Sequence, residues 1–440
     1  MRFLKIKNED LILDVYASLK SLLMTLSFNS TSLSCLKKKV GNESFTISSE
    51  TLVSNLLDSV DKKRVLFYEY NKIGDPIECT QKSSNTVCLG IDTGFANGFA
   101  QPLYIQYIKR DGVLKEVGFF TGIEIEKNLR LYRMGRIVFD DYEKANRFIK
   151  DLEKELLPGE VWKYEKTNFL GYRKTEYEIL ESYIRTVFEA LYDGWNLPAS
   201  LNYEKIKFSE DKKYALFNTG LLSKNARDVL VLGEVDWMDE KKRFCLLNPI
   251  LLRDGCTGLI NRGFSHSDLD VDMVSFFSDI SEIVYDATLK VDTDDIEKLN
   301  HCIEDGVKRG RFPEEWEQKF RDGRVREVTD RFIDAIRNSQ KIARRNYKYV
   351  VPQYRTTLVG NYIQFLMPIY MNSNYEKSPD FALVLSLVKD REGKKQFYRM
   401  ETILELAWAY NNARVICKPD DSWLNPSKIV GSAVLEEEME

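Results

Sequence analysis

The sequence predicts an α+β protein in which a mixed sheet with flanking helices follows a smaller α+β N-terminal module. Residues 293–308 and 324–343 carry apolar side chains at a 3.6-residue period, which predicts two long helices with one buried face each. The residues expected to be buried are Ile296, Leu299, Ile303 and Val307 in the first helix, and Val325, Val328, Phe332 and Ile336 in the second. Short apolar runs such as Phe381–Val388 predict strands.

The N-terminal module is predicted from helical and hairpin patterns that end at Pro158-Gly159. Two apolar runs flank Arg110-Asp111-Gly112, which is typical of a hairpin turn. The other predicted elements of the module are helices at 9–27, 50–60 and 141–157, a loop at 37–49, a strand at 64–70 and a glycine-rich loop at 90–98.

Beyond Pro158-Gly159 the chain is predicted to form one larger domain, residues 159–430, followed by an acidic tail, 431–440. We place the N-terminal module at residues 1–158 and expect residues 160–440 to fold without it. Further predicted elements are helices at 174–191 and 402–411 and strands at 214–217, 229–234, 243–247, 362–371 and 396–400. The sequence shows no internal repeat.

Composition indicates a folded protein of two or three domains in a reducing compartment. Of the 440 residues, 43% are apolar and 30% are charged. The seven cysteines are scattered, without a C-x-x-C pair, which favours free thiols in the cytoplasm. No apolar run approaches the length of a membrane span, so we expect no membrane association.

The most informative stretch is Arg344–Arg355, which concentrates cations, tyrosines and carboxamides in twelve residues. From Lys308 to Lys348 the chain has 13 Lys and Arg against 7 Asp and Glu, a net charge of +6 within a chain of net charge −4. Arginine binds phosphate in a bidentate manner and tyrosine stacks on bases, so the stretch is typical of an anion-binding surface. The alternatives are a solvated helix face and, for alternate tyrosines on one face of a strand, core packing.

A series of phrases in residues 160–425 resembles a family of unknown function, the OST-HTH-associated domain. They are Ala215–Leu221, Arg311-Phe312-Pro313, Asn346-Tyr347-Lys348, Val351–Tyr354, Pro379–Val384, Ala409–Arg414, Pro419-Asp420 and Trp423-Leu424. The resemblance implies a link to RNA, because members of that family occur beside OST-HTH modules, which are regarded as RNA-binding. The N-terminal module is not recognised, since its mixed helix and hairpin pattern is unlike a small winged helical module.

We therefore expect an intracellular RNA- or nucleotide-binding protein with a regulatory or defence-related role. The predicted ligand-binding residues are Asn218, Arg311, Arg344, Arg345, Tyr347, Lys348, Gln353, Tyr354, Asn411 and Arg414. Asn218 has a competing interpretation as part of an Asn-Thr-Gly turn, and Asn411 as part of a helix C-terminus.

Two other functions remain open, a phosphodiesterase or nuclease and a structural or effector-assembly protein that forms homo-oligomers. Asp380 with Glu392 and Lys394 matches the letters of a metal-dependent nuclease, although the last two lie in a predicted hairpin turn. Asp268, Asp270 and Asp272 alternate but do not fit a calcium-binding loop. With only two histidines, the sequence predicts no metal site and singles out no catalytic residue or cofactor.

Overall fold

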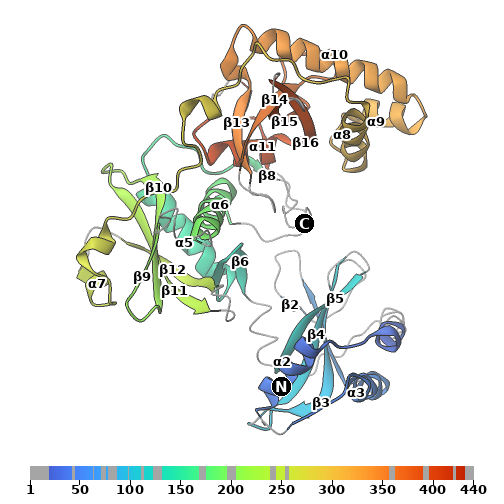
Figure 1. The fold of residues 1–440 in the computed structure, drawn as a ribbon, viewed down its shortest axis with the longest axis vertical. Helices are drawn as coiled ribbons and strands as arrows, with labels where there is room; N and C mark the ends of the chain where they lie inside the picture. The colour runs from blue at the N-terminus through green and yellow to red at the C-terminus, as the bar shows by residue number, and fades with distance from the viewer. Residues whose placement is uncertain are drawn as a thin grey trace. The chain divides into compact units, whose positions relative to one another are not determined.

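The structure of the protein is a computed structural model, drawn as a ribbon in Figure 1. It describes residues 19–41, 45–62, 64–70, 76–77, 87–97, 99–110, 113–121, 131–167, 175–195, 205–237, 244–252, 257–355, 362–389, 396–419 and 423–431. Helices and several antiparallel or mixed sheets confirm the α+β class. The chain divides into two compact units, the first comprising residues 1–132, 140–142 and 170–173 and the second the remainder.

The first unit is built on a five-stranded antiparallel sheet with the order β2-β1-β3-β4-β5. Its strands are β1 (Val65–Tyr70), β2 (Pro76–Ile77), β3 (Val87–Ala96), β4 (Pro102–Arg110) and β5 (Val113–Thr121). The helices α2 (Ser30–Val40) and α3 (Ser49–Asp61) pack on this sheet. Because Ser48 caps α3 by accepting from the Thr51 N–H at 3.2 Å, the helix begins with a satisfied end and turns Leu52 and Leu56 into the core.

The second unit contains a six-stranded mixed sheet with the order β6-β7-β12-β11-β10-β9. Its strands are β6 (Tyr132–Met134), β7 (Ile137–Phe139), β9 (Ile206–Phe208), β10 (Tyr214–Leu222), β11 (Asp228–Trp237) and β12 (Phe244–Leu252). In this sheet β7 and β12 pair in parallel, at Leu246 and Leu247 of β12. Two helices pack on this sheet through aromatic rings, α5 (Tyr142–Glu155) and α6 (Glu178–Trp195). The buried ring of Phe148 in α5 contacts that of Phe139, and the buried ring of Phe188 in α6 contacts that of Phe217.

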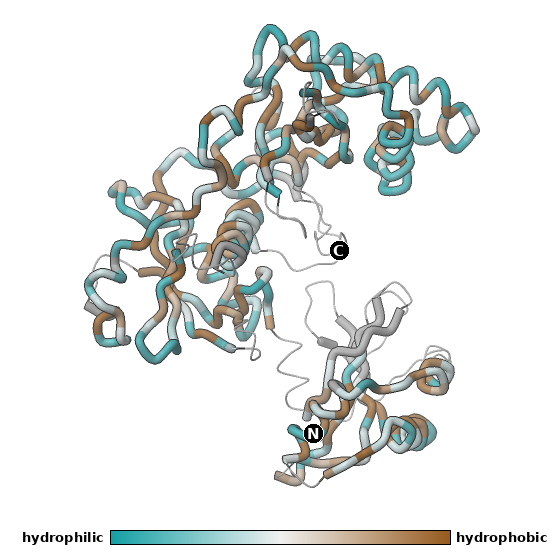
Figure 2. The backbone as a smooth tube through the Cα atoms, viewed as in Figure 1, coloured by the Kyte–Doolittle hydropathy of each residue, from teal (hydrophilic) through white to brown (hydrophobic). Residues whose placement is uncertain are grey.

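A four-stranded antiparallel sheet completes the second unit, together with a pair of short strands, β8 (Lys166–Thr167) and β17 (Val430–Gly431). Its strands are β13 (Val351–Arg355), β14 (Tyr362–Ile369), β15 (Phe381–Lys389) and β16 (Gln396–Leu404). The helices around it are α8 (Ile296–Lys308), α9 (Glu314–Arg321), α10 (Val325–Ala343) and α11 (Leu406–Arg414), and a four-residue helix, α7 (Thr257–Ile260), lies earlier in the unit. Hydrophilic and hydrophobic stretches alternate along α10, as an amphipathic helix requires (Figure 2).

The described residues contain a similar arrangement of one helix and antiparallel strands three times, which is a likeness of topology and not a repeat of sequence. In the second and third copies a helix precedes four antiparallel strands in chain order and packs on the second of them, α6 on β10 and α10 on β14. In the first copy α3 packs on β3, and the two-residue strand β2 is inserted between β1 and β3. In each copy a register shift interrupts the pairing of the third strand with the fourth, at Gln106/Tyr107, Leu232/Glu234 and Val384/Leu385. The sequence does not show this likeness, because strand pairing and an alternation of apolar residues can be formed by many different side chains.

A turn common to the first two copies gives the repeat its clearest signature. Thr93 and Thr219 are fully buried, and each hydroxyl donates to a strand carbonyl ten residues further on, Leu103 or Val229, at 2.8 Å. The preceding Asp92 accepts from the Gly94 N–H at 2.8 Å, as the preceding Asn218 accepts from the Gly220 N–H at 2.9 Å.

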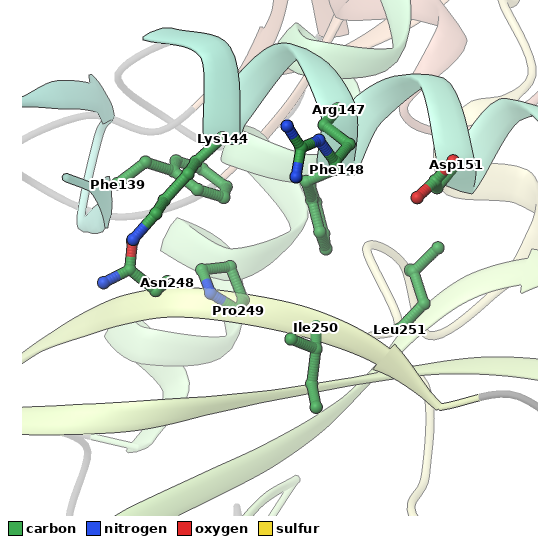
Figure 3. Close-up of a pocket in the computed structure, with 9 residues that line it drawn as sticks. All are labelled: Phe139, Lys144, Arg147, Phe148, Asp151, Asn248, Pro249, Ile250 and Leu251. Carbon is green, nitrogen blue, oxygen red and sulfur yellow. The ribbon is translucent and has the colours of Figure 1, made fainter. Parts of the chain in front are cut away.

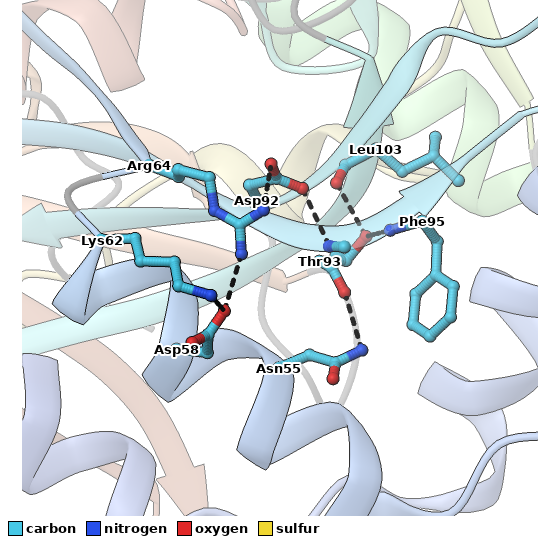
Figure 4. Close-up of polar contacts among 9 residues, drawn as sticks. Asn55, Asp58, Lys62, Arg64, Asp92, Thr93, Phe95 and Leu103 are labelled. Carbon is cyan, nitrogen blue, oxygen red and sulfur yellow. Dashed lines mark hydrogen bonds and ion pairs between the residues drawn. The ribbon is translucent and has the colours of Figure 1, made fainter.

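The packed helix completes this turn in both copies. Asn55 of α3 donates to the Thr93 carbonyl at 3.2 Å (Figure 4), and Tyr183 of α6 donates to the Thr219 carbonyl at 3.2 Å. Gly94 and Gly220 have φ values of 76° and 73°, which a residue with a Cβ rarely adopts. We call the residues Asp92–Gly94 and Asn218–Gly220 the threonine turns.

Most predicted elements are confirmed to within a few residues, but the loop predicted at 90–98 is wrong, because β3 continues through Ala96. Residues 30–40, expected to enter a loop from position 37, form α2, whose N-cap Asn29 accepts from the Ser32 N–H at 2.8 Å. Ile296 and Val325 are 69% and 41% exposed, because each is the first residue of its helix and precedes the face that packs. The predicted last helix starts later, since β16 continues to Leu404.

The predicted strand from Tyr347 onward begins instead as a 3-10 turn at Tyr347–Tyr349, and β13 follows from Val351. The first part of the predicted helix at 9–27, the turn at 111–112 and residues 432–440 of the acidic tail lie outside the described residues. None of the helices in the described ranges combines the length and apolar character that a bilayer crossing requires.

Candidate nucleic-acid interface

The residues that follow α10 are held in place by buried contacts at the end of that helix. Ser339 of α10 donates to the Pro368 carbonyl of β14 at 2.5 Å, and Phe332 and Ile336 are fully buried beside it. After Ala343 the chain enters the 3-10 turn, where Tyr349 is buried and its carbonyl accepts from the indole of Trp423 at 2.8 Å. Both ends of the segment 344–348 are therefore held by buried contacts.

Four cations and one aromatic ring face solvent in this held segment and in the last turn of α10 before it. We call Lys341, Arg344, Arg345, Tyr347 and Lys348 the cationic turn. All five are exposed, and Tyr347 has 52% of its surface accessible. Arg345 donates to the Lys341 carbonyl at 2.7 Å and so lies against the last turn of α10.

The cations of this turn have no carboxylate partner among the described residues, whereas Arg326 and Arg337 of α10 do. Arg331 of α10 is instead held by the Tyr370 and Met371 carbonyls and the Ser373 hydroxyl. Arg324, at the start of the helix, pairs with Glu327. Arg326 lies 3.8 Å from Asp330, and Arg337 lies 3.5 Å from Asp334. The positive charge counted along residues 308–348 is therefore compensated along the helix and uncompensated at its end.

Asn218 and Arg311, also predicted to bind a ligand, lie inside the protein. Asn218 is 2% exposed, and its amide donates to the Val271 carbonyl at 2.9 Å while its oxygen holds the threonine turn. The guanidinium of Arg311 donates to the Ile403 carbonyl at 2.6 Å and lies 5.4 Å from the ring centre of Trp408. Burial lowers the pKa of Arg311, with the nearby Arg309 acting in the same direction.

Gln353 belongs to a buried chain of carboxamides that crosses the four-stranded sheet. It is fully buried, and its amide donates to Gln364 at 3.1 Å. Gln364 in turn donates to the Ser386 hydroxyl at 3.0 Å, and Asn412 of α11 donates to the Gln353 oxygen at 3.1 Å. Each group satisfies the next, which is how buried polar groups avoid the desolvation penalty.

Asn411 and Arg414 join α11 to the segment that follows α5. Asn411 accepts from the Tyr164 hydroxyl at 2.8 Å. The Arg414 guanidinium pairs with Glu160 at 2.8 Å and lies 4.1 Å from the ring centre of Trp162. The last predicted residue, Tyr354, is 4% exposed and packs its ring 4.4 Å from that of Phe276.

The structure thus brings four of the ten predicted residues together on one surface, Arg344, Arg345, Tyr347 and Lys348. The other six make contacts within the protein. They are Asn218, Arg311, Gln353, Tyr354, Asn411 and Arg414. Lys341 was missed, although its position four residues before Arg345 on a helix is a signal that places the two on one face.

The carboxylates that suggested catalysis are either dispersed or outside the described residues. Asp380 accepts from the Met371 N–H at 2.7 Å, and burial raises its pKa. Glu392 and Lys394, the other letters of the nuclease pattern, are not among the described residues. Asp268 accepts from the Ser265 N–H at 2.8 Å in a 3-10 turn rather than alternating along a strand.

A scan against protein families matches residues 153–423 to a domain of unknown function, DUF3825, so the chain belongs to this family. The match covers more than half of the chain and confirms that the region predicted at about 160–425 is a domain of unknown function. Its description names no OST-HTH module, and that association stays a prediction. The searches of curated proteins and of solved structures gave no match.

Proposed function

We propose that this protein binds RNA through the cationic turn. The observation that carries the proposal is the group of four exposed cations, Lys341, Arg344, Arg345 and Lys348, without carboxylate partners in the described parts of the chain. Phosphate contacts supply most of the sequence-independent affinity of proteins for nucleic acids. Tyr347, exposed in the same turn, supplies a ring on which a base can stack.

A simpler explanation for cations at this place is the helix dipole, and its size can be compared with the charge present. The C-terminus of a helix carries about −0.5 of an elementary charge, which favours cations in the last turn. Four cations exceed that charge by about 3.5. The dipole therefore accounts for a small part of the positive charge, and a phosphate backbone that spans several residues accounts for the rest.

Salt dependence of binding tests the proposal. Binding of fluorescent single-stranded RNA is measured over a range of salt concentrations for the wild type and for the double variant Arg345→Gln, Lys348→Gln. Each lost phosphate contact lowers the slope of log K against log salt by about 0.7, so the double variant is expected to lose about 1.4. Tyr347→Leu is expected to weaken binding with little change of slope, because stacking releases few counterions.

The matched control is Arg326→Gln, Arg337→Gln, which removes the same charge from ion-paired positions on α10. Circular dichroism checks that all variants are folded. A wild type that binds no RNA, or a control that loses as much slope as the test variant, would overturn the proposal. Competition with free nucleotides distinguishes an RNA backbone site from a site for a single nucleotide.

A further inference from the structure

The loop that joins β14 to β15, residues 370–380, lies at the same end of the four-stranded sheet as the cationic turn. β13 and β14 are antiparallel, with Val351 opposite Leu366, so the start of β13 and the end of β14 meet at one end of the sheet. The cationic turn leads into β13, and the loop continues from β14. The same proximity shows at Tyr349 of the 3-10 turn, whose pKa is raised by burial and, in addition, by the nearby Tyr370 and Tyr375.

This β14–β15 loop is fixed by side chains of the two helices that precede it. Arg331 of α10 donates to the Tyr370 carbonyl at 3.1 Å and to the Ser373 hydroxyl at 2.6 Å. The indole of Trp316 in α9 donates to the Asn372 side chain at 2.8 Å. A loop that is already held in this way loses little further freedom when it contacts a ligand.

The fixed loop displays one aromatic ring, that of Tyr375. The ring of the buried Tyr370 supports it, with the two ring centres 4.8 Å apart, while 45% of the surface of Tyr375 remains exposed. An exposed ring that rests on a buried ring is a ready surface for a stacked base. Glu376 and Lys377, which follow it, have opposite charges, so this part of the loop offers a ring without net charge.

A pocket of about 530 Å³ between α5 and the face of β12 also has aromatic lining, but of a different character (Figure 3). Its two rings, Phe139 and Phe148, lie 5.4 Å apart and are buried, so they leave no open face for a base. Its charged lining has both signs, with Lys144 and Arg147 on α5 and Asp151 further along the same helix. The β14–β15 loop therefore suits a nucleic acid better than this pocket does.

We propose that the RNA bound by the cationic turn is single-stranded and continues over the β14–β15 loop, where a second base stacks on Tyr375. This inference rests on the proposed function, since the cationic turn supplies the phosphate contacts. Tyr347 and Tyr375 are 52% and 45% exposed, so two unpaired bases each have a ring to stack on. The bases of a duplex are stacked on one another and cannot reach these rings without opening the duplex.

The wild type tests the stacking without any substitution. Affinities are measured for a fluorescent single-stranded RNA, for the same RNA as a duplex, and for an abasic strand of equal length and charge. The single strand is expected to bind at least about tenfold more tightly than the abasic strand, since each stacked base contributes to affinity. Both strands are expected to show the same slope of log K against log salt, because they carry the same phosphates. The duplex is expected to bind more weakly than the single strand.

Tyr375→Leu tests the position of the second ring. It is expected to weaken binding of the single strand by at least about fivefold, to keep the salt slope, and to leave binding of the abasic strand unchanged. Tyr375→Phe keeps the ring and is expected to bind like the wild type. The control is Phe99→Leu, which removes a ring that is 88% exposed in the first unit, and it is expected to change neither affinity nor slope. Circular dichroism checks that the variants are folded.

The outcomes separate this inference from the proposed function. If the wild type binds single-stranded RNA with the expected salt slope but Tyr375→Leu leaves the affinity unchanged, the second stacking position is overturned and the cationic turn stands. The same holds if the wild type binds the abasic strand or the duplex as tightly as the single strand, or if Phe99→Leu loses as much affinity as Tyr375→Leu. A wild type that binds no RNA overturns both proposals.

Discussion

At the scale of single residues, burial decides what a side chain does, and residue type alone does not reveal burial. Arg311 and Arg414 are buried in contacts with aromatic rings and acceptors, whereas Arg344 and Arg345 are exposed. All four lie within four residues of an aromatic residue in the sequence and look equally suited to bind phosphate. The exposed part of the candidate site was predicted because cations and tyrosine are concentrated there. The sequence does not show that Arg311 and Arg414 are buried, because their partners, Ile403 and Glu160, are distant in sequence.

The first residue-scale prediction concerns Asp380. Burial raises its pKa above the ordinary value of 3.8, against the opposing effects of the Met371 N–H and Arg331. The folded state therefore binds the proton more tightly than the unfolded state, and the resulting stability is lost as the pH rises above about 4. Asp380→Asn keeps an oxygen for the Met371 N–H but cannot ionise. Urea unfolding is expected to show the variant gaining stability relative to the wild type between about pH 4 and pH 7.

Asp279→Asn provides a control with the opposite sign. The side chain and N–H of Ser281 lower the pKa of Asp279, so the wild type is favoured over that variant as the pH rises. Both differences are taken at the same pH values, which cancels the acid unfolding that all the proteins share. A relative loss of stability of Asp380→Asn on going to pH 7 would contradict the account of Asp380.

At the scale of elements, the sequence predicts the helices and strands better than their relation to one another. The apolar period of α10 and the runs of β14 to β16 are strong local signals, because one buried face dictates the spacing of apolar residues. The threonine turns depend instead on hydrogen bonds with a strand carbonyl and with a helix residue, Asn55 or Tyr183. Those partners differ in chemistry between the copies, and Thr-Gly also occurs at 121–122 and 257–258, so the sequence does not reveal the equivalence.

The equivalence of the threonine turns predicts equal responses to Thr93→Val and Thr219→Val. Valine has the shape of threonine but cannot make the two hydrogen bonds of its hydroxyl. Thr93→Val removes the partner of the Leu103 carbonyl and of the Phe95 N–H. Thr219→Val removes the partner of the Val229 carbonyl and of the Leu221 N–H. An unpaired buried polar group costs about 1–3 kcal/mol. Hydrogen exchange measured by mass spectrometry is expected to show lost protection in the unit that carries the substitution, by a similar amount in both variants.

Thr329→Val is the matched control, since its hydroxyl bonds within α10 to the Val325 carbonyl and lies at the helix surface. This substitution is expected to leave the exchange of both units nearly unchanged. A large effect of one threonine-turn variant beside a neutral result for the other would show that the two turns do not have equivalent roles.

At the scale of the whole molecule, the net charge and the Pro-Gly signal share one limit, since neither shows which parts of the chain pack together. The chain has a net charge of −4, yet four cations without a carboxylate partner among the described residues gather at the end of α10. Pro158-Gly159 follows α5 and is the predicted domain boundary, which stays a prediction, while the second compact unit includes residues from Arg133 onward. The helix before that boundary, α5, belongs to the unit that follows it.

The last prediction concerns where the second unit can be cut. Four apolar side chains of α5 are buried, those of Ala145, Phe148, Ile149 and Leu152. Two backbone hydrogen bonds also join the end of α5 to the end of β10: the Leu157 N–H donates to the Leu222 carbonyl at 3.1 Å, and the Lys224 N–H donates to the Glu155 carbonyl at 2.8 Å. A fragment of residues 131–440 keeps these contacts and β7, whereas residues 160–440 lose them. Burial of one apolar side chain contributes about 1.5–3 kcal/mol, so losing four removes enough free energy to unfold a typical domain. Thermal and urea unfolding are therefore expected to show a cooperative transition for the longer fragment and a weak or absent one for the shorter. Equal stability of the two fragments would show that α5 packs on the second unit without stabilising it.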